Sequence, residues 1–139
     1  MVRLKLAKKE DATPVASFFR ELYDNSIYSK ITKYKEEDVA ELVEKVSDSP
    51  DTGVVILLVD NEAIVGAMIC SYMNQIFNKE EKSAVEIAFW IKPEYKSISN
   101  LKSILGAYRY WAKQMGCTSI LYGKLKNDSS VESYIVRKL

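Results

Sequence analysis

The run at residues 53–59 constrains the fold most, because it is almost wholly apolar and rich in β-branched side chains. A strand of that composition is typical of one covered on both faces, so it predicts a sheet with a layer on each side. A second apolar segment at 63–72 follows the tight turn at 60–62, which predicts a hairpin. A further strand is predicted at 84–91, where Pro93 stops it. The middle of the chain therefore predicts an antiparallel meander.

Two helices are predicted between a first strand and this meander. Alternation of apolar and basic side chains indicates the strand, and apolar residues at helical spacing indicate both helices. The elements predicted here are a strand at 2–7, a helix capped by Asp11 or Thr13 and running to Asn25, a loop at 25–34 and a helix at 35–47.

A strand–helix–strand unit is predicted after the meander. Apolar residues from Leu101 to Met115 line one face of a long helix, and Gly116 follows where a left-handed C-terminal cap belongs. A strand at 118–125 and a short helix at 129–138, capped by Asp128 or Ser129, complete the chain. The order β-α-α-β-β-β-α-β-α predicts one mixed α/β domain over residues 1–139, with a mostly antiparallel sheet and one parallel crossover pair.

Composition excludes several kinds of chemistry. The sequence of 139 residues has no histidine, which rules out His-based triads, His metal ligands and His proton relays. Its two cysteines, Cys70 and Cys117, are too few for a thiolate zinc site, so no metal is expected. The longest apolar run, at 54–59, is far shorter than a membrane span, and the N-terminus lacks a signal-peptide pattern. We therefore expect a cytoplasmic protein with reduced thiols and no membrane partner.

Charge is distributed unevenly along the chain. The net charge is +1, yet residues 92–139 carry 9 basic and 3 acidic side chains. This asymmetry indicates a local anionic ligand. The alternative is chance clustering of charges on solvated helix faces.

Residues 86–122, EIAFWIKPEYKSISNLKSILGAYRYWAKQMGCTSILY, resemble one protein family in detail. They match a strand ending in an apolar-x-Pro-Glu-Tyr stretch, a phosphate-binding loop, a long helix ending in Trp-Ala-Lys and Gly, and a following strand. This pattern resembles the GNAT family of N-acetyltransferases, especially its small bacterial and bacteriophage members. The resemblance covers nearly the whole chain, and it implies a bacterial or phage-infected cytoplasm and acetyl-CoA as the acyl donor.

The resemblance also implies a cofactor site. In the family, the fourth strand binds the pantetheine arm through its backbone, and a loop with the pattern Arg/Gln-x-x-Gly-x-Gly/Ala holds the pyrophosphate at a helix N-terminus. Here Lys96 takes the first position, and Ser99 and Leu101 replace the two small residues, so the loop has no glycine. The implied cofactor-binding residues are Phe89, Trp90, Ile91, Lys96, Ser97, Ile98, Ser99, Asn100, Leu101 and Lys102. The alternative is that Ser99 only caps a helix and Lys96 is solvated.

Two residues are implied as catalytic. Glu86, on the fourth strand, takes the place of a carboxylate that accepts a proton from the amine, and partial burial suits that role by raising its pKa. The alternative is an exposed strand residue. The family also uses a tyrosine of the last helix as an acid. Tyr134 is the candidate here, although it lies two residues before the aligned position, and the alternative is a tyrosine packed against the sheet.

Three functional hypotheses follow. The first is an acyltransferase that moves an acetyl group from acetyl-CoA to a primary amine of a small molecule or protein, by direct attack in a ternary complex in which backbone N–H groups near residues 89–91 polarise the thioester. The second is a catalytically degenerate binding or structural protein of the same fold, such as a virion or host-interaction component. The third, nucleic-acid binding through the basic C-terminal third, is disfavoured because core packing explains aromatic residues such as Trp90 and Tyr108 better than base stacking does.

The sheet edge carries a further expectation. The resembled family usually continues with two more strands after its last helix, and this sequence ends at Leu139. An uncovered sheet edge is a pairing site, so a homodimer or an assembly partner is expected there.

Overall fold

The computed structural model describes residues 1–125 and 131–139. One sheet of six strands, in the order β1-β2-β3-β4-β5-β6, forms its centre. Every neighbouring pair is antiparallel except β4 and β5, which are parallel. The strands are β1 (Val2–Leu6), β2 (Gly53–Asp60), β3 (Ala63–Asn74), β4 (Lys82–Ile91), β5 (Ser119–Leu125) and β6 (Val131–Lys138).

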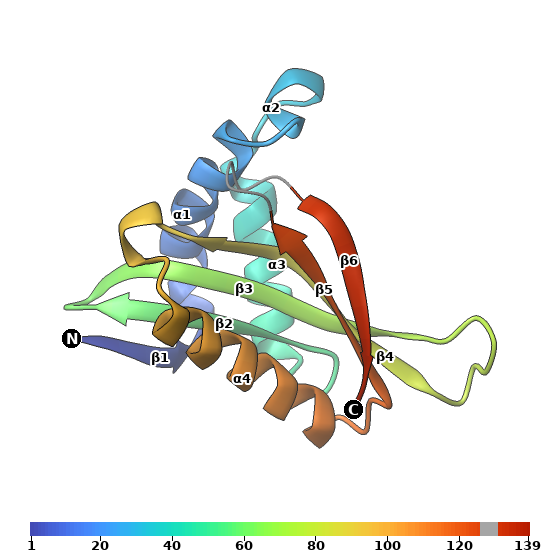
Figure 1. The fold of residues 1–139 in the computed structure, drawn as a ribbon. Helices are drawn as coiled ribbons and strands as arrows, with labels where there is room; N and C mark the ends of the chain where they lie inside the picture. The colour runs from blue at the N-terminus through green and yellow to red at the C-terminus, as the bar shows by residue number, and fades with distance from the viewer. Residues whose placement is uncertain (126–130) are drawn as a thin grey trace.

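Helices cover both faces of the sheet, as the apolar run predicted. They are α1 (Ala12–Asp24), α2 (Tyr28–Ile31), α3 (Glu36–Asp48) and α4 (Ile98–Gln114), with 3-10 turns at Lys9–Asp11 and Pro93–Tyr95. Helices α1 and α3 lie on one face and α4 crosses the other (Figure 1). Strand β2 supplies both layers, because Ile56 packs in the cluster beneath α4 while Val55 and Leu57 pack in the cluster beneath α1 and α3. None of the helices in the described residues has the length and apolarity needed to span a membrane.

Residues with positive φ end two elements where the sequence predicted a turn and a helix cap. The β2–β3 turn places Asn61 and Glu62 in the left-handed region, with φ of 48° and 73°. Turns of this handedness match the twist of a hairpin, which explains the short connection. Gly116 follows α4 with φ of 76°, the left-handed cap expected of glycine there.

The last predicted element is wrong. Residues 131–138 form strand β6 and not a helix, and β6 pairs antiparallel with β5, with Tyr134 opposite Gly123. The stretch Tyr134, Ile135 and Val136 combines an aromatic with two β-branched residues, which favour a pleated strand once a neighbour offers pairing. The candidate caps Asp128 and Ser129 lie outside the described residues. The loop predicted at 25–34 also differs, since it contains the single turn of α2.

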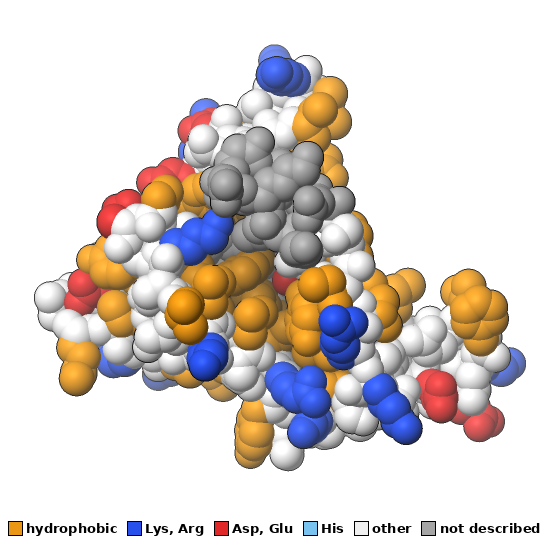
Figure 2. Space-filling view, viewed as in Figure 1, with side chains coloured by type: hydrophobic (Ala, Val, Ile, Leu, Met, Phe, Trp, Pro, Cys, Tyr) orange, Lys and Arg blue, Asp and Glu red, His pale blue; other side chains and the backbone are white. Residues whose placement is uncertain are grey.

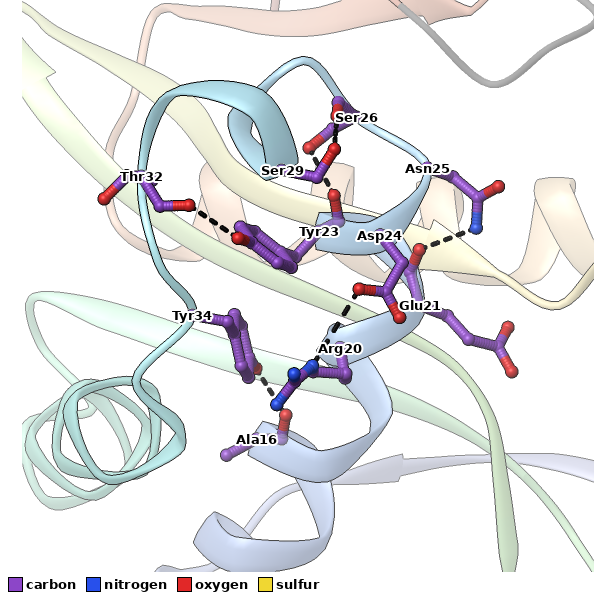
Figure 3. Close-up of polar contacts among 10 residues, drawn as sticks. All are labelled: Ala16, Arg20, Glu21, Tyr23, Asp24, Asn25, Ser26, Ser29, Thr32 and Tyr34. Atoms are coloured by element: carbon purple, nitrogen blue, oxygen red, sulfur yellow. Dashed lines mark hydrogen bonds and ion pairs between the residues drawn. The ribbon is translucent and has the colours of Figure 1, made fainter.

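Tyrosine hydroxyls form hydrogen bonds between helix α1 and the segment that joins it to α3. The Tyr23 hydroxyl donates to the carbonyl of Thr32, and the Tyr34 hydroxyl donates to the carbonyl of Ala16 (Figure 3). The Arg20 guanidinium lies 5.3 Å from the centre of the Tyr34 ring. Burial, together with the charge of a nearby glutamate, raises the pKa of Tyr34 to about 12. The hydroxyl therefore stays protonated and keeps donating at any physiological pH.

Candidate functional site

Strands β4 and β5 separate soon after they meet. Their parallel ladder has two residue pairs, Ser83 with Ser119 and Ala84 with Ile120. Beyond these pairs β4 continues to Ile91 and β5 to Leu125, and the two strands diverge beside α4 (Figure 1). We call this opening between residues 85–91 and 121–125 the splay. Backbone groups along it need partners other than the opposite strand.

Two side chains form hydrogen bonds with backbone groups of β5 that face the splay. The Glu86 carboxylate accepts the Gly123 N–H through Oε1 at 3.0 Å. The Tyr108 hydroxyl, on α4, donates to the Leu121 carbonyl at 2.7 Å. These bonds replace the interstrand bonds that a longer ladder would have made, so the sheet stays open without leaving these two groups of β5 unpaired.

Glu86 sits just before a β-bulge in β4. The register places Glu86 opposite Cys70 and Ala88 opposite Ile69, so Ile87 is the extra residue of the bulge. The second carboxylate oxygen of Glu86, Oε2, is buried and has no hydrogen-bond partner among the described residues. Burial raises the pKa of Glu86 above its usual value, and the Gly123 N–H offsets part of that effect. A carboxylate with a free oxygen and a raised pKa is suited to accepting a proton.

The backbone of β4 presents alternate residues to the splay. The Lys92 N–H donates to the Val65 carbonyl of β3 at 2.9 Å. Since antiparallel pairing alternates, the N–H of Trp90 faces β3 as well, while those of Phe89 and Ile91 face the splay. The Trp90 side chain enters the layer under α1 and is 4% exposed.

Helix α4 opens with Ser97 as its N-cap and not with Ser99. The Ser97 Oγ accepts the Asn100 N–H at 3.1 Å, and the Leu101 N–H donates to the Ser97 carbonyl at 2.9 Å. The N–H groups of Ile98 and Ser99 have no partner in the part of the chain that the structure describes. Such free N–H groups, with the helix dipole behind them, favour an anion.

Leu101 does not crowd this helix opening. It is half-buried and packs against the cluster beneath α4, so its side chain turns into the core. Lys96 and Lys102 are exposed and form no ion pair among the described residues. Figure 2 shows lysine and arginine side chains around an apolar surface on this face of the molecule. The opening of α4 thus combines free N–H groups with two available cations.

No protein-family model matches the sequence, and no curated protein matches it. Solved structures do match. A predicted acetyltransferase from Clostridium acetobutylicum, with acetyl-CoA, superposes with a TM-score of 0.70 at 14% identity, over 86% of this chain and 79% of that one. A GNAT-family acetyltransferase from Staphylococcus aureus gives 0.69 at 14% identity, over 90% and 75%. An aminoglycoside N-acetyltransferase in complex with CoA gives 0.71 at 10% identity, over 86% and 74%.

The chain has the GNAT acetyltransferase fold. The mixed sheet with one parallel pair confirms the fold class expected from the sequence. In this GNAT fold the resemblance from residues 86–122 maps onto β4, α4 and β5, the elements that border the splay.

Tyr134 lies on strand β6, one strand away from the splay, and not on a helix. It is 62% exposed on β6, opposite Gly123, whose N–H binds Glu86. The structure therefore brings both candidate catalytic residues next to Gly123, and the exposure of Tyr134 argues against a tyrosine packed into the sheet.

Sequence reasoning missed Tyr108 and Gly123 as site residues. Tyr108 was identified from its spacing as part of the apolar face of the long helix, and it is fully buried. A signal was present, because a buried tyrosine hydroxyl almost always needs a partner. The sequence gives no indication of a role for Gly123. Its backbone N–H is available to Glu86 because β4 and β5 no longer pair at this point, and only the structure shows that.

Proposed function

We propose that this protein transfers an acetyl group from acetyl-CoA to a primary amine of a small molecule or a protein. The observation that carries the proposal is the buried carboxylate of Glu86, which has one unpartnered oxygen inside the splay. The similarity to acetyltransferase structures that contain acetyl-CoA or CoA supports the donor.

The residues along the splay and at the opening of α4 fit this cofactor. The N–H groups of Phe89 and Ile91 would bind an amide-bearing arm that lies along β4 in place of a neighbouring strand. The N–H groups of Ile98 and Ser99 and the cations at the α4 opening would hold its phosphates. When bound, acetyl-CoA supplies an acetyl group activated as a thioester. The full proposed set is Phe89, Trp90, Ile91, Lys96, Ser97, Ile98, Ser99, Asn100, Leu101 and Lys102, with Trp90 and Leu101 contributing through the packing that shapes the splay and the loop.

Glu86 is the proposed general base. Its Oε2 accepts a proton from the ammonium group of the acceptor, while its Oε1 stays on the Gly123 N–H and fixes the orientation of the carboxylate. The raised pKa of Glu86 moves its proton affinity toward that of an amine, which makes the transfer less unfavourable. The amine nitrogen then attacks the thioester carbonyl, the C–S bond breaks, and the CoA thiolate leaves. The Tyr134 hydroxyl, one strand away, is the proposed donor of the proton that this thiolate takes up.

Calorimetric titration with acetyl-CoA and with free CoA tests the binding step. We expect micromolar affinity for acetyl-CoA. An acetylation assay on a panel of amines tests Glu86, for which Glu86→Gln should keep cofactor binding and lose about 100-fold to 10,000-fold in turnover. The matched control is Glu44→Gln, at an exposed position on α3. No binding at millimolar acetyl-CoA would refute the proposed function, and unchanged turnover would remove Glu86 from it.

A second candidate function is that of a binding or structural protein with this fold. The absence of glycine from the loop that leads into α4 favours this second candidate. So does strand β6, which stands at the edge of the sheet and exposes Tyr134 and Val136 at 62% and 54%. Such an edge accepts another strand, from a second copy or an assembly partner. Sedimentation analysis distinguishes the candidates, because a protein of this kind should assemble and ignore CoA.

A further inference from the structure

A cavity lies on the α1 side of the sheet, away from the splay. Its volume is about 520 Å³, within the range of small-molecule sites. Its walls come from β1, the 3-10 turn before α1, α1 itself, β2, the β2–β3 turn, the start of β3 and the residue after β4. None of Glu86, Gly123 or α4 lines it. The apolar part consists of Pro14, Phe18, Leu57, Val59 and Ile64, of which Phe18, Leu57 and Val59 are buried. This cavity is therefore separate from the proposed cofactor site.

Four of the six charged side chains that line the cavity form ion pairs, which leaves one acidic and one basic side chain without an ion-pair partner among the described residues. Lys5 bonds to Asp11 at 3.1 Å, and Arg3 approaches Glu62 at 4.0 Å. The remaining lining charges, Glu21 and Lys92, form no ion pair among the residues that the structure describes. An unpaired carboxylate and an unpaired ammonium thus border one cavity without touching each other.

The carboxylate of Glu21 is held in place from within the core. The Trp90 indole N–H donates to its Oε2 at 3.2 Å, which leaves Oε1 available. Figure 3 shows the Glu21 side chain pointing away from the cluster of Tyr23 and Tyr34. This bond from a buried indole orients the carboxylate of the exposed Glu21 side chain before any ligand arrives, which lowers the entropy cost of binding.

We propose that the cavity binds a small zwitterion of the α-amino acid class with an aliphatic side chain. Its ammonium group bonds to the carboxylate of Glu21, and its carboxylate bonds to the ammonium of Lys92. Its side chain lies on the surface formed by Phe18, Leu57 and Ile64. A ligand with both charges makes two charge-assisted contacts, one to Glu21 and one to Lys92, whereas a ligand with one charge makes only one of them. The site does not depend on acetyl transfer.

Equilibrium dialysis with labelled L-leucine tests the proposal, with Trp90 emission in a Trp111→Phe background as a second readout. We expect saturable binding with a dissociation constant below about 10 mM, a weak small-ligand affinity. N-acetyl-L-leucine and leucine methyl ester each lack one charge and should bind about ten-fold more weakly or worse, as should the variants Glu21→Gln and Lys92→Met. Glu21→Gln keeps an oxygen for the Trp90 N–H, so the fold is retained.

The matched controls are Glu44→Gln and Lys30→Met, which change exposed charges outside the cavity and should bind leucine like the parent protein. Absence of saturable leucine binding overturns the proposal. So does equal binding of leucine and its two blocked forms, or parental affinity in both Glu21→Gln and Lys92→Met. Because the readout is leucine binding, a failure here leaves the acetyl-CoA result unaffected.

Discussion

Tyr108→Phe removes one hydroxyl from the centre of the core and leaves the ring in place. Tyr108 is fully buried, and its hydroxyl donates to the Leu121 carbonyl at 2.7 Å. The ring keeps its edge-on contact with Tyr122, at 6.3 Å between centroids, so the substitution creates almost no cavity. Its effect therefore reports on the hydrogen bond alone.

The expected loss of stability is the cost of leaving the Leu121 carbonyl without its hydrogen-bond donor. With β4 diverging, no strand replaces the hydroxyl, and leaving this partly buried carbonyl unsatisfied costs about 1–3 kcal/mol. At about 2.1 cal/mol/K per residue, the unfolding entropy of a 139-residue chain is about 0.3 kcal/mol/K. We therefore expect the melting temperature to fall by about 3–10 °C.

Urea unfolding and thermal denaturation measure this change. Tyr110→Phe is the matched control, because Tyr110 lies on the same helix and is 67% exposed. Its stability should stay within about 0.5 kcal/mol of the parent. If Tyr108→Phe were as stable as the parent, the Leu121 carbonyl would have another partner, and the hydroxyl would not be what replaces the missing interstrand bond there.

Further predictions concern local backbone and charge. Gly106→Ala should raise the free energy of unfolding by about 0.5–1 kcal/mol, since an added Cβ meets nothing within 4 Å. Gly116→Ala should lower it by about 1–2 kcal/mol, because φ is +76°. Ser97→Ala should cost about 1 kcal/mol through loss of the α4 cap, and an unchanged urea midpoint would contradict that cap. The raised pKa of Glu86 favours its protonated form in the folded state. Its stabilising contribution is therefore complete below its usual pKa of 4.5 and is lost as pH rises through the raised value. As pH rises through that range, the free energy of unfolding of Glu86→Gln, measured by urea titration, should increase relative to that of the parent. A difference between the two proteins that stays constant with pH would refute this.

Much of the fold was predictable because local pattern and tertiary environment agree. Strand β2 is apolar on both faces and is buried on both, and Gly116 stands where only a residue tolerant of positive φ fits. The final element was not predictable in the same way. Its residues pair with β5 across an intervening segment, and that pairing outweighs a helical reading of Tyr134 and its neighbours.

In the candidate site too, some features could be predicted from local sequence and others depend on tertiary packing. Glu86 was identifiable as an acidic residue between apolar neighbours in a strand, and the structure places its carboxylate in a largely buried position and not facing solvent. The capping role of Ser97, in place of Ser99, depends on where the first turn of α4 begins, and sequence patterns locate helix ends only to within a few residues. The inward turn of Leu101 likewise depends on packing against β-strands distant in sequence.

The two-pair ladder between β4 and β5 also bears on how the domain opens. Strands β1 to β4 are joined by ladders of five to nine residue pairs, whereas the backbone ladder that joins β5 to β4 has two, Ser83–Ser119 and Ala84–Ile120. A unit held by so few backbone bonds opens at lower free energy than the rest. Amide protons of the paired strands β5 and β6 should therefore exchange with solvent before those of β2 and β3. A molecule that binds both strands of the splay would delay that exchange, so hydrogen exchange reports occupancy of the splay without any enzymatic assay.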